Sequence, residues 1–284
     1  MEHSLDALIH LTRGRRVAVL TGAGVSVDSG IPDYRGPTTR HLVRNPVKHD
    51  EFVRSAAARR RYWSRASRGY AAVGEAQPNA AHTALAALEA AGHLTGLITQ
   101  NVDGLHQAAG SERVVELHGK LREVVCLACA KTYRRDAVQA QIARENPAWL
   151  RTLAPVAPGQ LAPDGDAELA PETQARFRAP QCPACGGDLM PDVVFFGGSV
   201  PKPRVAEAFA LVESADALLV AGSSLTVFSG YRFVRFAARR AMPIAIVSLG
   251  PTRGDAHAHV KVDGPVGEVL PGLLAGLKSG GVAG

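Results

Sequence analysis

The sequence predicts an α/β protein with a Rossmann-like, doubly wound parallel sheet and a small zinc-binding domain inserted into it. Three observations predict this fold. Short apolar runs that end in Gly, Ser, Asn or Asp recur along the chain, helix-like segments separate them, and four cysteines form two CxxC pairs. The 284 residues are 46% hydrophobic and 20% charged, a composition typical of a globular protein with a core of its own.

The apolar runs are the expected strands of the sheet. They cover residues 16–20 (RVAVL), 94–98 (LTGLI), 218–221 (LLVA) and 244–247 (IAIV). An amphipathic helix pattern precedes the first strand, and the helical patterns at 80–92 and 203–215 supply crossover connections between strands. In an open parallel sheet the ligand lies beyond the carboxyl ends of the strands, so the residues that follow each run are candidates for a binding site.

Two glycine-rich segments follow the expected strands. Gly22, Ala23 and Gly24 allow a tight turn and a close approach to a pyrophosphate, and a helix starting there would offer free N–H groups to phosphates. The next glycine is Gly30, so the GxGxxG fingerprint of dehydrogenases is not present. A second loop, with Gly222, Ser223 and Ser224, follows the third expected strand, and Ser248 and Gly250 follow the fourth.

The stretch TQNVDGLHQAAG (99–110) begins where the second expected strand ends. Gln100, Asn101 and Asp103 place two amides and a carboxylate at this strand end. A helix cap or a turn requires only one such residue. Amides donate and accept hydrogen bonds without adding charge, so this group of side chains indicates a polar ligand site.

The two CxxC pairs contain Cys126, Cys129, Cys182 and Cys185. Four thiolates that converge on one ion form the closed tetrahedral shell of a structural zinc site. Two disulfides would suit a secreted protein, and a redox CxxC motif usually stands alone near the start of a helix. We therefore expect one structural zinc ion, with a long insertion (130–181) between the pairs that has at most short helices in its Pro/Ala-rich part.

Charge and hydropathy exclude several classes of protein. The net charge of +6, from 32 basic and 26 acidic residues, suits anionic ligands. The longest basic cluster is residues 59–61, so a specific nucleic-acid partner is not expected. No apolar run is long enough to cross a membrane, and the first residues lack the pattern of a secretory signal, so a cytoplasmic location is expected.

Taken together, these motifs resemble the sirtuin family of NAD-dependent protein lysine deacylases. The matching segments are GAGVSVDSGIPDYR (22–35), TQNVDGLH (99–106), ELHG (116–119), the CxxC pairs, PDVVFFG (191–197) and GSSL (222–225). RYWSR, LAPDGD, SGYRF and GPTRGD resemble the class II, sirtuin-4-like branch. The resemblance implies a discontinuous Rossmann-like domain (1–119 and 191–284), a small zinc domain (120–190), and a cleft between them for NAD and an acyl-lysine protein.

The resemblance also implies roles for individual residues. His118 corresponds to the catalytic base, which activates a ribose hydroxyl after nicotinamide has been expelled, and Asn101 belongs to the same catalytic centre. The residues implied in NAD binding are Gly22, Ala23, Gly24, Ser26, Asp33, Tyr34, Arg35, Gln100, Asn101, Asp103, Gly222, Ser223, Ser224, Ser248, Leu249, Gly250 and Val266. Val193, Val194 and Phe195 correspond to the edge that pairs with the substrate and walls the acyl-lysine tunnel.

Tyr62 and Arg65 stand three residues apart, so they share a helix face. A Tyr-x-x-Arg pair holds the acyl carboxylate in sirtuins that remove acidic acyl groups, and an arginine with a phenol can bind a carboxylate. The alternative is an ordinary cationic helix face, because residues 59–61 are all arginine.

Three rival functions remain open from the sequence. The same NAD pocket could support mono-ADP-ribosyl transfer to a protein, and an NAD- and zinc-binding module could act without catalysis. The set of His118, Asn101 and Asp103 disfavours a module without catalysis, because a pure binder needs no base. A hydride-transfer dehydrogenase is disfavoured by the missing GxGxxG pattern and the closed zinc shell.

Overall fold

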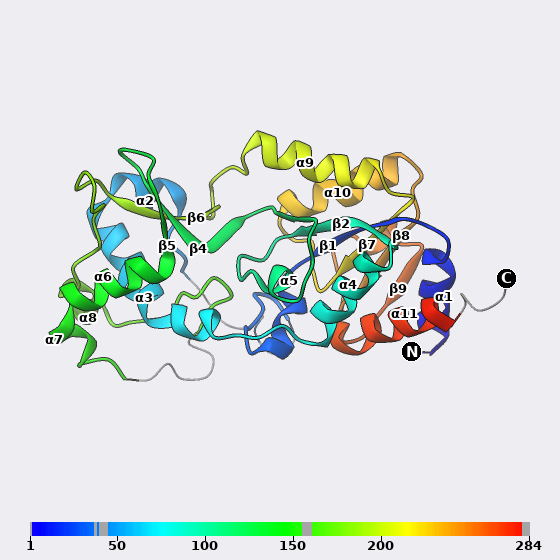
Figure 1. Cartoon of the computed structure of the whole chain (residues 1–284), viewed down its shortest axis with the longest axis horizontal. Helices are drawn as coiled ribbons and strands as arrows, with labels where there is room; N and C mark the ends of the chain where they lie inside the picture. The colour runs from blue at the N-terminus through cyan, green and yellow to red at the C-terminus, as the bar shows by residue number, and fades with distance from the viewer. Residues whose placement is uncertain (1, 37–38, 40–44, 155–160, 280–284) are drawn as a thin grey trace.

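The computed structural model describes residues 2–36, 39, 45–154 and 161–279. Figure 1 shows an elongated molecule with a larger α/β part at one end, which contains both chain termini, and a smaller part at the other. None of the helices among the described residues combines the length and the apolar character that crossing a membrane requires.

The larger part is built on a six-stranded parallel sheet with the order β3-β2-β1-β7-β8-β9. The strands are β1 (Val17–Thr21), β2 (Leu94–Thr99), β3 (Val114–Glu116), β7 (Ala217–Ala221), β8 (Ile244–Val247) and β9 (Val260–Val262). This doubly wound order confirms the predicted fold class, and each of the four predicted strands lies within one residue of its expected limits. The order reverses between β1 and β7, which is where such sheets bind their ligands.

Helices cover both faces of this sheet, as Figure 1 shows. One face packs against α1 (Glu2–Thr12), α4 (Ala80–Ala90) and α11 (Val266–Ser279), and the other against α9 (Lys202–Glu213) and α10 (Phe228–Arg239). Strand β1 shows why a continuous apolar run is needed. Val17 and Val19 belong to the first core, whereas Ala18 and Leu20 belong to the second, because successive side chains point to opposite faces.

The smaller part contains a three-stranded antiparallel sheet with the order β5-β4-β6. These strands are β4 (Gly119–Cys126), β5 (Thr132–Arg134) and β6 (Leu189–Val193), and the helices around them are α2 (His49–Arg54), α3 (Ala56–Gly74), α6 (Arg135–Glu145), α7 (Pro147–Leu150) and α8 (Pro171–Ala175). In the described part of the Pro/Ala-rich stretch, α7 and α8 are short, as predicted. The remaining short elements are α5 (Leu105–Ala108) and the 3-10 turns η1 (Ala23–Val25), η2 (Val27–Ser29) and η3 (Asp255–His257).

The core of the smaller part also includes a segment that precedes it by more than fifty residues. Residues 47–66 contribute Phe52 and Trp63, which are almost fully buried against this sheet. The indole Nε1 of Trp63 donates a hydrogen bond of 3.0 Å to the carbonyl oxygen of Leu189 in β6. The limits of 120–190 inferred for the small domain do not include this segment, because only tertiary packing brings it there.

Two buried histidines, His82 on α4 and His106 on α5, pack against each other. His82 and His106 have ring centroids 4.8 Å apart, and Nε2 of His106 lies 2.9 Å from Oγ1 of Thr21 at the end of β1. Burial lowers the pKa of His82 to about 4. Burial, and then the charge of His82, lower the pKa of His106 to about 3. Both rings are therefore neutral in the folded protein at neutral pH.

This pair predicts a loss of stability in mild acid. The unfolded chain binds protons at these histidines near pH 6.5, whereas the folded chain does so only near pH 4 and below, so the free energy of unfolding falls as pH drops below 6.5. We expect these two histidines to contribute a loss of roughly 3 kcal/mol between pH 7 and pH 5 to the pH dependence measured by thermal unfolding. His82→Gln should reduce this pH dependence, while the exposed His10→Gln should not; equal pH dependence in both variants would contradict the prediction.

Candidate active site

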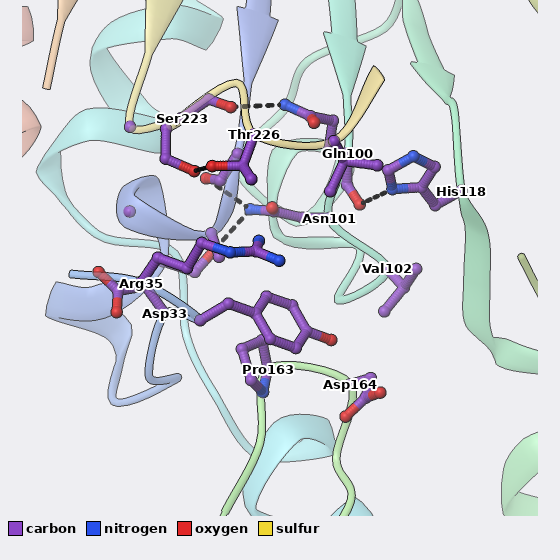
Figure 2. Close-up of a pocket in the computed structure, with 18 of the residues that line it drawn as sticks. Asp33, Arg35, Gln100, Asn101, Val102, His118, Pro163, Asp164, Ser223 and Thr226 are labelled. Carbon is purple, nitrogen blue, oxygen red and sulfur yellow. Dashed lines mark hydrogen bonds between the residues drawn. The ribbon is translucent and has the colours of Figure 1, made fainter. Parts of the chain in front are cut away.

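A cavity of about 880 Å³ lies at the carboxyl edge of the parallel sheet. The loops that follow β1, β2, β7 and β8 all contribute to its wall, and β6 and the insertion contribute from the smaller part. Figure 2 shows Asp33, Arg35, Gln100, Asn101 and His118 around this space, with Pro163 and Asp164 of the insertion on the opposite side. The position confirms that the polar strand ends converge, which is the geometry expected for the sheet's ligand site.

The two glycine-rich loops pack directly on each other. A Cβ atom on Gly24 would lie 2.8 Å from the carbonyl oxygen of Gly222, and one on Gly22 would lie 2.8 Å from Cβ of Ser223. The N–H of Gly24 donates a hydrogen bond of 2.9 Å to that same Gly222 oxygen. Glycine is therefore required at positions 22 and 24 because a larger residue would force the loops apart.

The helix predicted after the GAG turn does not form. Residues 23–29 instead make the 3-10 turns η1 and η2, and Gly30, with φ of 84°, ends the segment. Ser26, between the turns, is fully buried and its hydroxyl donates a hydrogen bond of 2.7 Å to Oδ2 of Asp103. This tertiary contact holds the chain away from a regular helix. The prediction that a helix N-terminus offers free N–H groups to phosphates here is therefore wrong. The N–H of Gly24 already donates a hydrogen bond to the Gly222 carbonyl oxygen.

The polar residues after β2 join the loops around the cavity to one another. Nε2 of Gln100 donates hydrogen bonds to Ser223 Oγ (2.8 Å) and to the carbonyl oxygen of Thr21 (3.1 Å). Nδ2 of Asn101 donates to the carbonyl oxygen of Gly22 (3.2 Å) and to Oγ of Ser26 (3.1 Å). Two amides therefore fix both glycine-rich loops against the end of β2, and Figure 2 shows several of these bonds.

Asp103 is a partly buried carboxylate at the same edge. Its oxygens accept hydrogen bonds from Ser26 Oγ (2.7 Å) and from the N–H of Leu105 (2.9 Å) at the start of α5. Burial raises the pKa of Asp103, although the hydrogen bonds from Leu105 and Ser26 and the charge of Arg122 oppose the shift. Asp103 thus accepts a hydrogen bond from the first residue of α5 and also presents a carboxyl group to the cavity.

His118 precedes β4, which leads from the sheet edge into the smaller part. Its Nδ1 lies 2.9 Å from the carbonyl oxygen of Gln100, and its Nε2 lies 2.7 Å from Oγ of Ser229 on α10. A carbonyl can only accept, so Nδ1 carries the proton and Nε2 has a free lone pair that accepts from the serine. Burial lowers the pKa of His118, and the charges of Arg204 and Arg232 lower it further against the opposing bond to Gln100. The ring is therefore neutral and able to act as a base.

Strand β6 contributes an apolar stretch to the cavity wall. Val193, Val194 and Phe195 all line the cavity, and the N–H of Val194 donates a hydrogen bond of 2.8 Å to the carbonyl oxygen of His118. The ring of Phe195 packs 4.9 Å from that of Phe52 and 5.1 Å from that of Tyr62. Strand β6 lies at the edge of its sheet, so it can accept an added strand.

The cavity includes nearly all of the residues predicted to bind the cofactor. Gly250 is the exception: its N–H donates a hydrogen bond of 2.9 Å to Oδ1 of Asp263, and it does not line the cavity. Sequence reasoning missed several lining residues. They include Ile31, Val47, Val102, Pro163, Asp164, Asp166, Thr226, Val227, Phe228, Ser229 and Arg232. Spacing could have indicated only Ser229 and Arg232, which stand one helical turn apart after the GSSL segment.

Tyr62 and Arg65 take different positions. Tyr62 lines the cavity, and burial raises its pKa above the usual range. Arg65 does not line the cavity, and its Nε donates a hydrogen bond of 2.8 Å to Oδ1 of Asp166 in a nearly buried ion pair. The structure therefore does not bring the pair together as a carboxylate-binding site. The reason is that Asp166 already occupies the guanidinium.

We expect Arg65→Met to act on stability rather than on acyl selection. The change leaves Asp166 buried without its cation and should lower the free energy of unfolding by about 3 kcal/mol. Thermal unfolding measures this loss, and the exposed Arg60→Met is the matched control. A selective loss of activity on glutaryl-lysine over acetyl-lysine peptides, with the melting temperature unchanged, would restore the role predicted from the sequence.

Four cysteines meet at the far end of the smaller part. The Sγ atoms of Cys126, Cys129, Cys182 and Cys185 all lie within 4.8 Å of one another, and none of the four forms a disulfide. The contacts of 3.5 Å between Cys126 and Cys185 and 3.8 Å between Cys129 and Cys182 match a tetrahedral zinc shell, in which sulfurs lie roughly 3.8 Å apart. Four sulfur ligands leave no open position, so the cluster fits a structural ion.

The fold and the site together define the class of this protein. It is an α/β protein with a ligand cavity at the carboxyl edge of a Rossmann-like sheet and a separate four-cysteine module. A model of the Sir2 family matches residues 22–229. The chain belongs to this family, the sirtuins, which confirms the family predicted from the sequence.

Individual relatives support the same assignment. Over 268 residues the chain is 52% identical to NAD-dependent protein deacetylase 1 of Mycobacterium avium (strain 104), covering 94% of this chain and 93% of the relative. It is 46% identical to the mitochondrial NAD-dependent protein lipoamidase sirtuin-4 of Bos taurus, covering 92% of this chain and 82% of the relative. The solved structure described as "Sir2-p53 peptide-NAD+" has a TM-score of 0.76 and 31% identity, covering 98% of this chain and 99% of the other.

Proposed function

We propose that this protein is an NAD-dependent protein lysine deacylase that removes acetyl or related acyl groups from lysine side chains. The observation that carries the proposal is the neutral imidazole of His118, whose Nε2 lone pair faces Ser229 in the wall of the cavity at the carboxyl edge of the sheet. The relatives named NAD-dependent protein deacetylase support the same activity. About half of their residues are identical to those of this chain over most of its length.

The cavity fits a dinucleotide. Gly22 and Gly24 let the loops after β1 and β7 pack directly on each other, and the lining residues from the loops after β1, β7 and β8 extend along the sheet edge. We assign Gly22, Ala23 and Gly24 to the pyrophosphate, and Ser223, Ser224 and Ser248 to the adenosine half. Bound NAD would supply the electrophilic ribose carbon that the acyl oxygen attacks, with nicotinamide as the leaving group.

The chain's own residues position the substrate and move one proton. We assign Val193, Val194 and Phe195 to the wall of the acyl-lysine channel, with the edge of β6 pairing with the peptide backbone. We assign Asn101 and Asp103, which both line the cavity, to the nicotinamide-ribose region, where the buried Asn101 helps to exclude water from a reactive sugar. His118 accepts a proton at Nε2 from a ribose hydroxyl, once that hydroxyl has replaced the Ser229 hydroxyl as the hydrogen-bond partner of Nε2.

An acyl-peptide panel tests the proposal. Acetyl-, succinyl-, glutaryl- and lipoyl-lysine peptides are incubated with NAD and the protein, and nicotinamide release is followed for each. Mass spectrometry should find free lysine and O-acyl-ADP-ribose in solution. A mass increase on a protein target without deacylation would instead indicate mono-ADP-ribosyl transfer, and no nicotinamide release from any peptide would contradict the proposed function.

A further inference from the structure

Arg232 is a cavity-lining residue that the proposed reaction does not use. It lies on α10, three residues after Ser229, whose hydroxyl touches Nε2 of His118. Residues three apart on a helix are neighbours on one face, so Arg232 lies beside the same opening as the catalytic base. Its charge also acts on the His118 imidazole. The guanidinium is therefore close to where the reaction takes place.

Among the described residues, the positive charge of Arg232 has no carboxylate counter-ion. Its Nε is buried and makes no hydrogen bond, and none of the ion pairs among the described residues includes it. Arg65 and Arg204, by contrast, pair with Asp166 and Asp192. A guanidinium stays charged at every physiological pH, so burying part of it without an anion is unfavourable unless a ligand supplies one.

Three acidic residues of the cavity already have other partners. Asp33 accepts a hydrogen bond of 2.8 Å from the N–H of Gly36 and another from Thr39. Asp103 accepts from Ser26 and Leu105, and Asp166 is paired with Arg65. The loop that we assign to the pyrophosphate follows the end of β1, whereas Arg232 stands on α10, three residues after the serine that contacts the base.

The surroundings of Arg232 are those of a peptide entrance. Phe228 is 48% exposed although it lines the cavity, and the guanidinium carbon of Arg232 lies 5.5 Å from the centroid of its ring. Val227 and Phe196 are each 37% exposed and also line the cavity. An exposed apolar rim with a cation beside the catalytic base suits a peptide with an anionic group.

We propose that Arg232 binds a carboxylate of the acyl-lysine substrate, carried either by the acyl chain or by a side chain next to the lysine. The inference rests on the proposed function, because it names the chemistry of the substrate that enters this site. Selectivity for the acyl group or for the residues next to the lysine would then depend on α10 and not on the helix face that contains Tyr62 and Arg65. Arg232 is thus a specificity residue, in contact with the substrate and separate from the base.

Binding of labelled peptides, measured by fluorescence anisotropy without turnover, tests this assignment. The peptides contain acetyl-lysine with neutral neighbours, acetyl-lysine with glutamate neighbours, or glutaryl-lysine with neutral neighbours. Arg232→Gln should weaken binding of at least one carboxylate peptide roughly tenfold and of the neutral peptide less than about twofold. The peptide that responds identifies the source of the carboxylate. Arg232→Lys should recover part of the loss.

Arg235→Gln is the matched control. Arg235 lies on the same helix, also near the Phe228 ring, but it is exposed and does not line the cavity. Equal weakening of all three peptides, no weakening of any, or the same pattern in Arg235→Gln would overturn the inference. So would a selective loss of NAD affinity in Arg232→Gln, which would assign the cation to the phosphates. Nicotinamide release by the wild-type protein tests the proposed function separately.

Discussion

His118→Ala is expected to reduce the turnover number roughly 10²- to 10⁴-fold, the usual contribution of a positioned general base. The reason is that Nε2 of this ring, made available by the bond from Nδ1 to the Gln100 carbonyl, is the free lone pair placed to accept the ribose proton. Nicotinamide release from an acetyl-lysine peptide measures the effect. His10→Ala, at an exposed position on α1, is the control and should retain full activity.

Stability and pH dependence separate this prediction from a general loss of structure. The melting temperature of His118→Ala, and its increase on addition of NAD, should stay close to those of the wild type. Because burial lowers the pKa of His118, the base stays neutral as pH falls below 6.5, and wild-type activity should decline only at more acidic pH. Turnover in His118→Ala within tenfold of the wild type would remove this residue from the catalytic role.

Loss of the zinc site is expected to unfold the smaller part of the molecule. The apparent free energy of zinc binding to such sites is roughly ten kcal/mol or more, which is comparable to the whole stability of a domain. The three-stranded sheet depends on the cluster, because Cys126 ends β4 and its buried side chain belongs to the core of this part. Cys126→Ala should therefore be unfolded or aggregated, and a strong zinc chelator should have the same effect on the wild type.

The control for this prediction lies within the same CxxC turn. Leu127 is 44% exposed and contributes no sulfur, so Leu127→Ala should remain folded and active. Circular dichroism and limited proteolysis monitor the smaller part in both variants. A Cys126→Ala protein that is folded, resists proteolysis and binds NAD would show that the cluster contributes little to folding.

The sequence predicts the parts of the fold that local patterns specify. Strands β1, β2, β7 and β8 are apolar on both faces, because helices cover the sheet on each side, and such runs are visible in the sequence. Strands β3 and β9 have only three residues each and exist through pairing with β2 and β8. No local signal of comparable strength marks them. Similarly, the packing of residues 47–66 on the smaller sheet depends on contacts with partners far along the chain.

The same division applies to the site. Residues that follow the strand ends were predictable, because parallel strands bring their carboxyl ends to one edge. Contacts between residues distant in sequence could not be predicted. Asp166 lies 101 residues from Arg65 and removes it from the cavity wall, while Ser229 lies 111 residues from His118 and meets its Nε2. The GAG turn has no helix after it because Ser26 is held by Asp103, 77 residues away.

A crystal structure with a non-hydrolysable NAD analogue and an acetyl-lysine peptide would show where the cofactor binds. We expect the cofactor to lie along the strand ends with its nicotinamide ribose facing position 118. We predict that a ribose hydroxyl lies within hydrogen-bonding distance of Nε2 of His118, in place of Ser229, with the pyrophosphate over Gly22 and Gly24. A cofactor bound elsewhere, or a ribose out of reach of that imidazole, would contradict the account.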